Sequence, residues 1–452
     1  MNILRNESGL MTEGSIFKKI LLFSIPLLLG NFFQLMYNTI DSFVVGNYVG
    51  SSALAAVGSS TPIINFMIAF FQGLSTGAGV VVSKYYGARN QDKLEKSVHT
   101  FIVFSFLFGL FLTILGYFIS PYLLEWMDTP SDSFVDANNY LKIYFLGNVF
   151  VTLYNAGTGI LQSVGNARTP LIILIVSSII NIFLDIFLVK YVKMGVSGAA
   201  LATIICQLLS VIFVLYILFK NKTEYQLHFN KLKIHLKTLK EIVYIGVPAG
   251  LQGMVVSVSN VVVMYYINGF GSSAVAGFSS ANKFDNFLGL PVNSFALAIT
   301  TFISQNLGAK KFDRVKKGVR TTLLMSLVTV IVLGTFVMIF ARECIGIFSD
   351  DEAVIENGVK CIRTMCPFYF ALCFHQVYSG VLRASGRSFV PMFTSILAFV
   401  VIRQIFLKIT LNIIHDITIV GYSYSFTWIL AAIFTATYYH KSGWLKKEMA
   451  KA

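Results

Sequence analysis

Long apolar stretches recur along the whole chain and constrain its fold more than any other feature. The 452 residues are 56% hydrophobic and only 12% charged, and their mean hydropathy is +0.72. A soluble protein carries about a quarter charged residues, whereas about 20 apolar residues cross a bilayer as a helix. About twelve runs approach this length, at residues 20–45, 53–82, 101–119, 140–163, 171–189, 196–219, 242–267, 274–302, 321–340, 361–382, 392–414 and 419–439. Only helices or closed barrels satisfy the backbone in lipid, and these runs do not alternate as barrel strands do. We therefore predict an all-α integral membrane protein.

The placement of the basic residues predicts the orientation of these helices. Lys and Arg gather at residues 84–96, 220–240 and 310–320, after the second, sixth and eighth runs. The loops after the third and ninth runs are acidic instead. This positive-inside pattern puts both termini in the cytoplasm, although Lys190 and Lys193 depart from it. The net charge of +14 is thereby explained by a multi-pass protein of the plasma membrane, and we expect the lipid bilayer rather than nucleic acid as its partner.

The second half of the chain repeats the first. GSSALAAVGSS at Gly50 resembles GSSAVAGFSSA at Gly271, an offset of 221 residues (271 − 50). The same offset relates Pro170 to Pro391 and the loop SKYYGAR to SQNLGAK. Each half holds six runs, an even number, so both halves have the same orientation and are related by an axis along the membrane normal. We predict two six-helix lobes in parallel repeat, 1–225 and 226–452, with a cytoplasmic linker before the second.

Two aspartates stand alone at membrane depth. Asp41 lies in QLMYNTIDSFVVG and Asp185 in SSIINIFLDIFLV, and Asn181 shares a helix face with Asp185 because it lies four residues earlier. A charge at this depth costs roughly 2.5–3.5 kcal/mol on insertion scales and often marks an ion or substrate path. At about 1.5 Å per residue, these positions and Thr203 fall in the outer half of the membrane.

The four side chains have the chemistry of a cation site. Two carboxylates, an amide oxygen and a hydroxyl suit Na⁺, by the logic of other hard cations. Two neighbouring carboxylates can instead carry a proton. The alternative is a hydrogen bond between packed helices that has no role in transport. At the repeat offset, the second half has Val262 and Phe406 in place of the two aspartates, so packing of the repeat does not require carboxylates.

The second half carries its own charges at depth. Lys283 and Asp285 lie near the middle of the eighth run, and Arg403 lies in the eleventh. Asp285 and Arg403 either form a structural pair between helices or line a substrate cavity together with Lys283. His375 is expected to be a core histidine rather than a proton relay. Three polar residues of the first half are further candidates for the substrate cavity: Gln34, Tyr37 and Asn155.

Enzyme classes find no support in the sequence. It contains no P-loop, no HExxH and no GxSxG motif, and its five cysteines lack the spacing of a metal site. We expect no cofactor and no metal other than Na⁺ at Asp41, Asn181, Asp185 and Thr203. A two-lobed repeat suits alternating access, with a cavity between the lobes and an ion gradient as the energy source. A channel is less favoured because it is normally built by oligomeric symmetry, whereas one copy of this chain should suffice.

The order of the motifs resembles the multidrug and toxin extrusion (MATE) family over nearly the whole chain. The motifs are Ile25-Pro26, the loop at 87–89, its counterpart Q-N-L-G-A-K at 305–310, N-x-x-x-D at 181–185 and G-x-x-G-A-A-x-A-T at 195–203. The resemblance implies Na⁺- or H⁺-driven antiport that exports organic cations or amphipathic drugs. It also implies that Asp41, Asn181, Asp185 and Thr203 form the cation site, with Asp285 as a second coupling candidate. The runner-up is a lipid-linked oligosaccharide flippase of the same superfamily.

Overall fold

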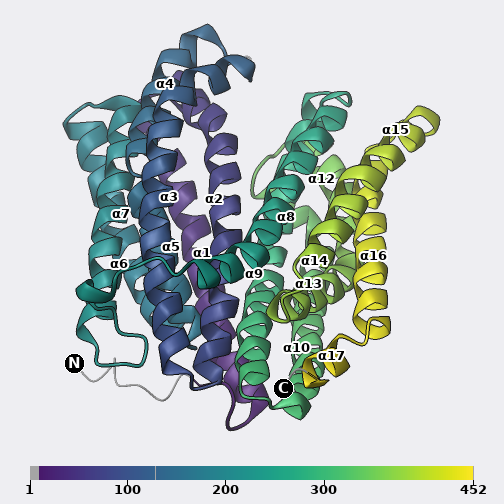
Figure 1. Cartoon of the computed structure of the whole chain (residues 1–452). Helices are drawn as coiled ribbons and strands as arrows, with labels where there is room; N and C mark the ends of the chain where they lie inside the picture. Colours follow the sequence, from purple (N-terminus) through teal and green to yellow (C-terminus); the bar gives the residue numbers. More distant parts are fainter. Residues whose placement is uncertain (1–9, 128, 451–452) are drawn as a thin grey trace. The chain divides into compact units, whose positions relative to one another are not determined.

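The regular structure of the chain is helical throughout the part that the computed structural model describes, residues 10–127 and 129–450 (Figure 1). Ten helices in this part are long and apolar enough to cross a membrane. The prediction of an all-α membrane protein is thereby confirmed. The predicted cytoplasmic location of the termini concerns residues 1–9 and 451–452, which lie outside the described part.

The helices of the first half follow one another with short connections. In chain order they are α1 (Ile16–Tyr48), α2 (Ser51–Gly87), α3 (Gln91–Trp126), α4 (Ser131–Leu146), α5 (Asn148–Ser163), α6 (Arg168–Asp185), which continues as a π-helical segment (Ile186–Tyr191), and α7 (Gly195–Lys220). The linker then contains one 3₁₀ turn, at Phe229–Lys231.

The second half repeats this order with more interruptions. Its helices are α8 (Leu236–Asn268), α9 (Ser272–Gly308), α10 (Phe312–Ile339), α11 (Ala341–Gly346), α12 (Glu352–Met365), α13 (Tyr369–Ala384), α14 (Phe389–Ser395), α15 (Arg403–Ile413), α16 (Thr418–Lys441) and α17 (Trp444–Ala450). A π-helical segment, Ile396–Ile402, joins α14 to α15, so these three pieces form one crossing.

Two of the predicted crossings are built from pairs of shorter helices. The run at 140–163 corresponds to α4 and α5, which meet at Gly147. The run at 361–382 corresponds to α12 and α13, which are separated by a 3₁₀ turn that contains Pro367. Proline has no backbone N–H and interrupts a helix. No member of these pairs reaches the length of about 20 residues that spans a bilayer. Each pair together supplies one crossing, which brings the ten long helices to the predicted twelve.

The chain forms two compact units, and α1 and α8 each contribute to both. One unit contains Ile25–Gly246, and the other contains Met11–Ser24 and the chain from Val247 onward. The change of unit falls beside Pro26 in α1 and Pro248 in α8. Since a proline inside a helix removes one backbone hydrogen bond, each of these helices has a built-in point of bending where it leaves one unit for the other.

The internal repeat extends to the packing within each unit. In the first unit, α2 packs against α3, α4 and α5, and α7 packs against α4, α5 and α6. In the second unit, α9 packs against α10, α12 and α13, and α16 packs against α12 and α13. Repeat-related helices therefore occupy equivalent places in the two units, as the offset of 221 residues predicts.

Polar contacts fix the start of α1 on the second unit. The N–H of Met11 donates to the Gln305 side chain (2.8 Å), and its carbonyl accepts from Asn306 (3.3 Å) and from Arg314 (3.1 Å). Arg314 also donates to the carbonyl of Gly14 (2.9 Å). Because Gln305 and Asn306 belong to the Q-N-L-G-A-K motif, this motif anchors the segment that leads into α1.

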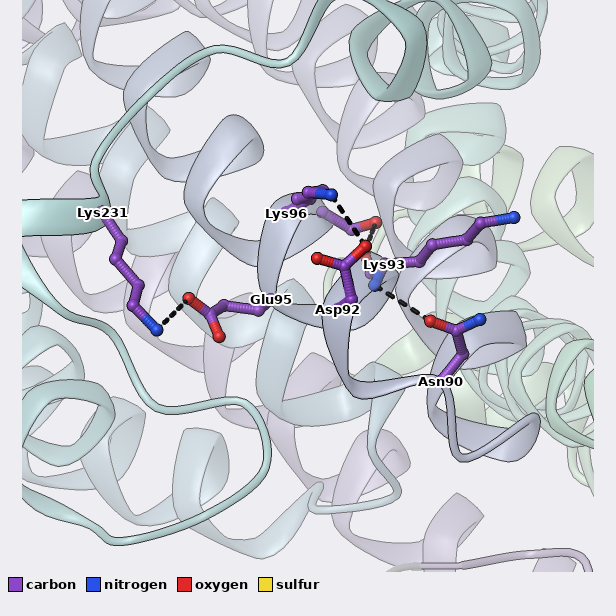
Figure 2. Close-up of polar contacts among 7 residues, drawn as sticks. Asn90, Asp92, Lys93, Glu95, Lys96 and Lys231 are labelled. Carbon is purple, nitrogen blue, oxygen red and sulfur yellow. Dashed lines mark hydrogen bonds and ion pairs between the residues drawn. The ribbon is translucent and has the colours of Figure 1, made fainter.

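The linker is anchored on the first unit in a related way, at the start of α3 (Figure 2). Lys231 forms an ion pair with Glu95 (2.7 Å), and the N–H of His235 donates to Thr100 (3.1 Å). The Asn90 side chain caps α3 by accepting from the N–H of the third residue of the helix. An exposed ion pair contributes little stability, so the contacts to the linker backbone matter more here.

A close approach between two helix backbones in the first unit predicts a sensitive position. A Cβ atom at Gly77 would lie 2.5 Å from the Cα of Gly246, so α2 and the N-terminal part of α8 touch through their backbones. We expect Gly77→Leu to lower stability by about 1–3 kcal/mol, the usual cost of overpacking. Gly58→Leu, also in α2, is the matched control because no atom lies within 4 Å of its Cβ position. Melting temperatures in detergent check this, and equal values for the two variants would contradict it.

Candidate cation-binding site

The structure brings the four predicted cation-site residues together within the first unit. Asp41 comes from α1, Asn181 and Asp185 from the end of α6, and Thr203 from α7. Their exposed fractions are 9%, 1%, 0% and 7% respectively. The carboxyl groups of Asp41 and Asp185 face each other closely enough to interact, and the hydroxyl of Tyr37 in α1 donates to Thr203 Oγ1 (3.1 Å). The site therefore joins three helices.

The sequence of α6 explains why its polar residues point inward. Asn181 and Asp185 are four residues apart and share one helix face. The exposed face of α6 is apolar instead and consists of Ile172, Val176, Ile179 and Phe183. The backbone becomes π-helical directly after Asp185. Such local widening is frequent at functional sites, and here it begins at the carboxylate.

The site has more buried polar atoms than hydrogen-bond partners. Asp41 Oδ1, both carboxylate oxygens of Asp185 and both polar side-chain atoms of Asn181 have no partner. A buried polar atom without a partner costs about 1–3 kcal/mol, and two ionised carboxylates in contact repel each other. A cation removes both costs, either as a proton held by the pair or as a hard ion bound by oxygen atoms. The residues present therefore fit a bound cation.

Two tyrosines and a cysteine complete the site, and sequence reasoning missed them. Tyr140 of α4 is buried and interacts electrostatically with Asp41 and Asp185, and Tyr144 interacts with Asp41. Cys206 of α7 contacts the Asn181 side chain. Tyrosine is common in membrane helices and carries little signal by itself. The one available signal in the sequence was the four-residue spacing of Tyr140 and Tyr144, which places both on one helix face.

A transition-metal site finds no support in the described residues. They contain no group of three or more His, Cys, Asp or Glu side chains that could hold a metal ion. The five cysteines are free thiols, all buried. Two carboxylates with neutral oxygen ligands are thus the donor set available, and this set suits an alkali cation or a proton rather than zinc.

The helices of the first unit differ in the polarity of their exposed residues. Lipid offers no hydrogen-bond partner, so exposed apolar residues indicate a surface that faces lipid, and exposed polar residues indicate a surface that faces water. The exposed residues in the span of α3 are apolar, among them Phe106, Leu110, Phe111, Ile114 and Phe118. Those of α1 and α2 include Asn31, Gln34, Asn38, Thr61, Asn65 and Gln72. Of the predicted cavity residues, Gln34 thus lies on the polar face, whereas Tyr37 and Asn155 are half-buried.

The second unit shows the same division. The exposed residues in the span of α10 include Leu324, Val328, Ile331, Val332 and Phe336. Those of α8 and α9 include Asn260, Asn282, Lys283, Asn286 and Asn293. The Lys283 ammonium lies 4.0 Å above the centre of the Phe348 ring, so its charge is stabilised by an aromatic face.

Asp285 and Arg403 do not form the direct ion pair that their charges predict, so that prediction is wrong. Both residues are described, and no ion pair joins them; their charges interact only at longer range. Arg403 is buried (2% exposed) and donates to Thr427 Oγ1 from two nitrogens (3.0 and 3.2 Å). Asp285 accepts a hydrogen bond from the Tyr369 hydroxyl. The guanidinium also lies 4.2 Å from the centre of the Tyr424 ring, so the aromatic face contributes to stabilising its charge.

His375 is fully buried, as a core residue would be. One ring nitrogen pairs with the hydroxyl of Thr435 (2.9 Å) and the other with that of Ser395 (3.1 Å). Gln252 donates to the same serine (2.8 Å). The imidazole is therefore held by neutral hydroxyl groups on both sides.

Comparison with known proteins identifies the family to which the chain is similar. The sequence profile of the MatE family matches the chain twice, at residues 26–187 and 248–409. A probable multidrug resistance protein of Bacillus subtilis, YoeA, is 30% identical over 396 residues, which cover 86% of this chain and 85% of YoeA. The multidrug export protein MepA of Staphylococcus aureus is 22% identical, with 83% of each chain covered.

Solved structures agree with the fold. An outward-facing multidrug resistance MATE family transporter of the MOP superfamily superposes with a TM-score of 0.91 at 22% identity and covers 99% of each chain. A MOP superfamily transporter from Pyrococcus furiosus also gives 0.91, at 23% identity, over 98% of this chain and 99% of that one.

These matches define the chain as a multi-pass membrane transport protein with two repeated halves. It belongs to the MatE family, the multidrug and toxin extrusion transporters, and is thus a multidrug efflux transporter and not an enzyme. The family resemblance of its motifs is confirmed.

The hydrogen bond between Tyr37 and Thr203 yields a prediction for the site. Tyr37→Phe removes this bond but keeps the Thr203 hydroxyl, and it should raise the ion concentration for half-maximal export by about fivefold, the equivalent of about 1 kcal/mol. Thr203→Val removes the bond together with a candidate cation ligand and should have the larger effect. The double variant should be little worse than Thr203→Val, because the two partners of one bond are not additive. Export rates at graded ion concentrations measure this, and multiplying effects would contradict it.

Proposed function

We propose that the chain is an antiporter that exports organic cations or other amphipathic drugs in exchange for Na⁺ or H⁺ by alternating access. Asp41, Asn181, Asp185 and Thr203 bind the coupling cation in this proposal. The single observation that carries it is the facing pair of buried aspartates, in which Asp41 Oδ1 and both carboxylate oxygens of Asp185 lack hydrogen-bond partners. The protein works as a monomer in the plasma membrane with both termini in the cytoplasm, and it needs no cofactor beyond the coupling ion.

The path of α1 supports coupling between the cation and the rest of the molecule. Asp41 and Tyr37 lie in the part of α1 that belongs to the first unit, whereas Met11–Ser24 belongs to the second. Without a cation, the repulsion between Asp41 and Asp185 favours separation of α1 from α6. A cation draws the two helices together. The segment that leads into α1 is held by hydrogen bonds to Gln305 and Arg314, so any resulting movement of α1 acts on this anchored segment.

The polar faces support a drug-like cargo. Exposed amides of α1, α2, α8 and α9 offer hydrogen bonds at membrane depth without fixing one substrate shape. Relatives carry names of multidrug resistance and multidrug export proteins. A flippase for lipid-linked oligosaccharides is favoured less, because a pyrophosphate calls for a cationic site, and the first unit holds an aspartate pair.

Neutralising either aspartate should uncouple transport. Asp41→Asn and Asp185→Asn each remove a charged ligand, and we expect each to lower gradient-driven efflux at least about tenfold, since bonds to charged groups are worth about 1.5–3 kcal/mol. The double variant should be little worse than either single variant because the pair acts as one unit. Dye efflux from everted vesicles measures this, and gradient-driven export by a well-expressed Asp41→Asn protein would refute the proposal.

Asp285→Asn is the matched control, since it also removes one carboxylate at membrane depth. We expect lower expression or an altered substrate range with ion coupling retained. If this variant loses coupling while Asp185→Asn keeps it, the cation site lies in the second unit. Imposing the Na⁺ and the H⁺ gradient separately in the same vesicles identifies the coupling ion.

Alternating access predicts that labelling changes with state. Cysteines introduced at Tyr37 and Asn155 should react with a polar thiol reagent at rates that differ by severalfold when substrate is added or the gradient is collapsed. Both residues are half-buried, so their accessibility can rise or fall. A cysteine at Phe111, exposed on the apolar face of α3, serves as the control. Rates that respond to neither condition at either site would argue against alternating access.

A further inference from the structure

The bounds of the two profile matches indicate which part of the second unit corresponds to the cation site. Residues 26 and 248 begin the matches, and 187 and 409 end them, so the offset is 222 at both ends. Between them, Pro170 and Pro391 keep an offset of 221. The π-helical segment Ile396–Ile402 follows Pro391 and accommodates the additional residue.

This register pairs Asn181 with Arg403, because each lies six residues before the end of its match. The partners of Arg403 come from the equivalent helices. Thr427 lies in α16, the counterpart of α7 with Thr203, and Asn260 lies in α8, the counterpart of α1. The second unit thus contains a counterpart of the cation site on the same three crossings.

The chemistry of this counterpart is inverted. Counted from the match boundaries, Asp41 corresponds to Val263 and Asp185 to Leu407, whereas the offset of 221 pairs them with Val262 and Phe406. None of these four residues is a carboxylate. Both carboxylates are therefore absent, and in the place of the neutral Asn181 stands a guanidinium, which remains charged in proteins.

We propose that Arg403 is an internal cation that occupies, in the second unit, the place that the coupling cation takes in the first. Its donors point to Thr427 (3.0 and 3.2 Å) and Asn260 (3.4 Å), and the Tyr424 ring lies 4.2 Å away. A covalently attached cation cannot leave, so the second unit stays in the cation-bound state. Resting on the proposed function, this inference assigns each chain one exchangeable cation site.

Asp285 supplies the balancing charge in this arrangement. It interacts with Arg403 at longer range, and the Tyr369 hydroxyl holds its carboxylate in place. A buried cation without any carboxylate nearby is costly. Asp285 is thus a counter-charge for the internal cation and not a ligand of an exchangeable ion.

A graft of the arginine into the first unit tests the equivalence. Asn181→Arg places a guanidinium beside Asp41 and Asp185. In the wild type, the melting temperature should rise with Na⁺ or with protons, whichever is the coupling ion, and Asp41→Asn should abolish this rise. Asn181→Arg should also abolish the rise, melt near the temperature of the ion-saturated wild type, and lose gradient-driven export. Asn181→Gln, which adds length without charge, should keep a rise. A folded Asn181→Arg protein that still responds to the ion would overturn the proposal.

Removal of the internal cation provides a second test. If the Asn181→Arg protein does not fold, this second test decides the proposal. Arg403→Gln should lower the melting temperature by several degrees and Arg403→Lys by less. Arg403→Gln/Asp285→Asn should recover most of the loss, because both charges are gone, and should be driven by the same ion as the wild type. A double variant no more stable than Arg403→Gln, or one that folds but is not driven by that ion, would overturn the proposal. Retained coupling in Asp41→Asn would instead refute the proposed function, whatever Arg403 does.

Discussion

The aspartate pair at membrane depth is the interaction on which the proposed function of this structure depends. A bilayer offers polar groups no partners, so every backbone donor is used inside a helix and the exposed faces of α3 and α10 are apolar. Asp41 and Asp185 depart from this constraint: they are buried inside the first unit, where their carboxyl groups face each other. In the proposed function a cation stabilises the unpartnered oxygens of the pair, and the need for that cation links the fold to an ion gradient.

Much of this arrangement could be predicted from the sequence. The lengths of the apolar runs set the helices, and the offset between Gly50 and Gly271 indicated the repeat. The isolation of Asp41 and Asp185 and the spacing of Asn181 indicated three members of one site. These features depend only on the spacing and the polarity of residues, and a single sequence shows both.

The remaining features depend on packing between helices that no spacing reveals. Tyr140 and Tyr144 reach the aspartates because α4 packs against α7, although a tyrosine in an apolar run carries no signal of its own. Their opposite charges alone predict a direct pair between Asp285 and Arg403. Their partners are instead a tyrosine hydroxyl and a threonine hydroxyl, Tyr369 and Thr427.

The π-helical segments show why a repeat can diverge in chemistry without losing its fold. A π-turn adds one residue and shifts the register of everything that follows it by about 100° around the helix, since an α-helix has 3.6 residues per turn. In α6 the widening follows Asp185, so both polar residues precede it. In the second unit it precedes Arg403 and brings the arginine to the position of Asn181. One inserted residue is therefore enough to let two halves of common design hold a carboxylate pair in one unit and a guanidinium in the other at equivalent sites, while α7 and α16 each keep a threonine, Thr203 and Thr427.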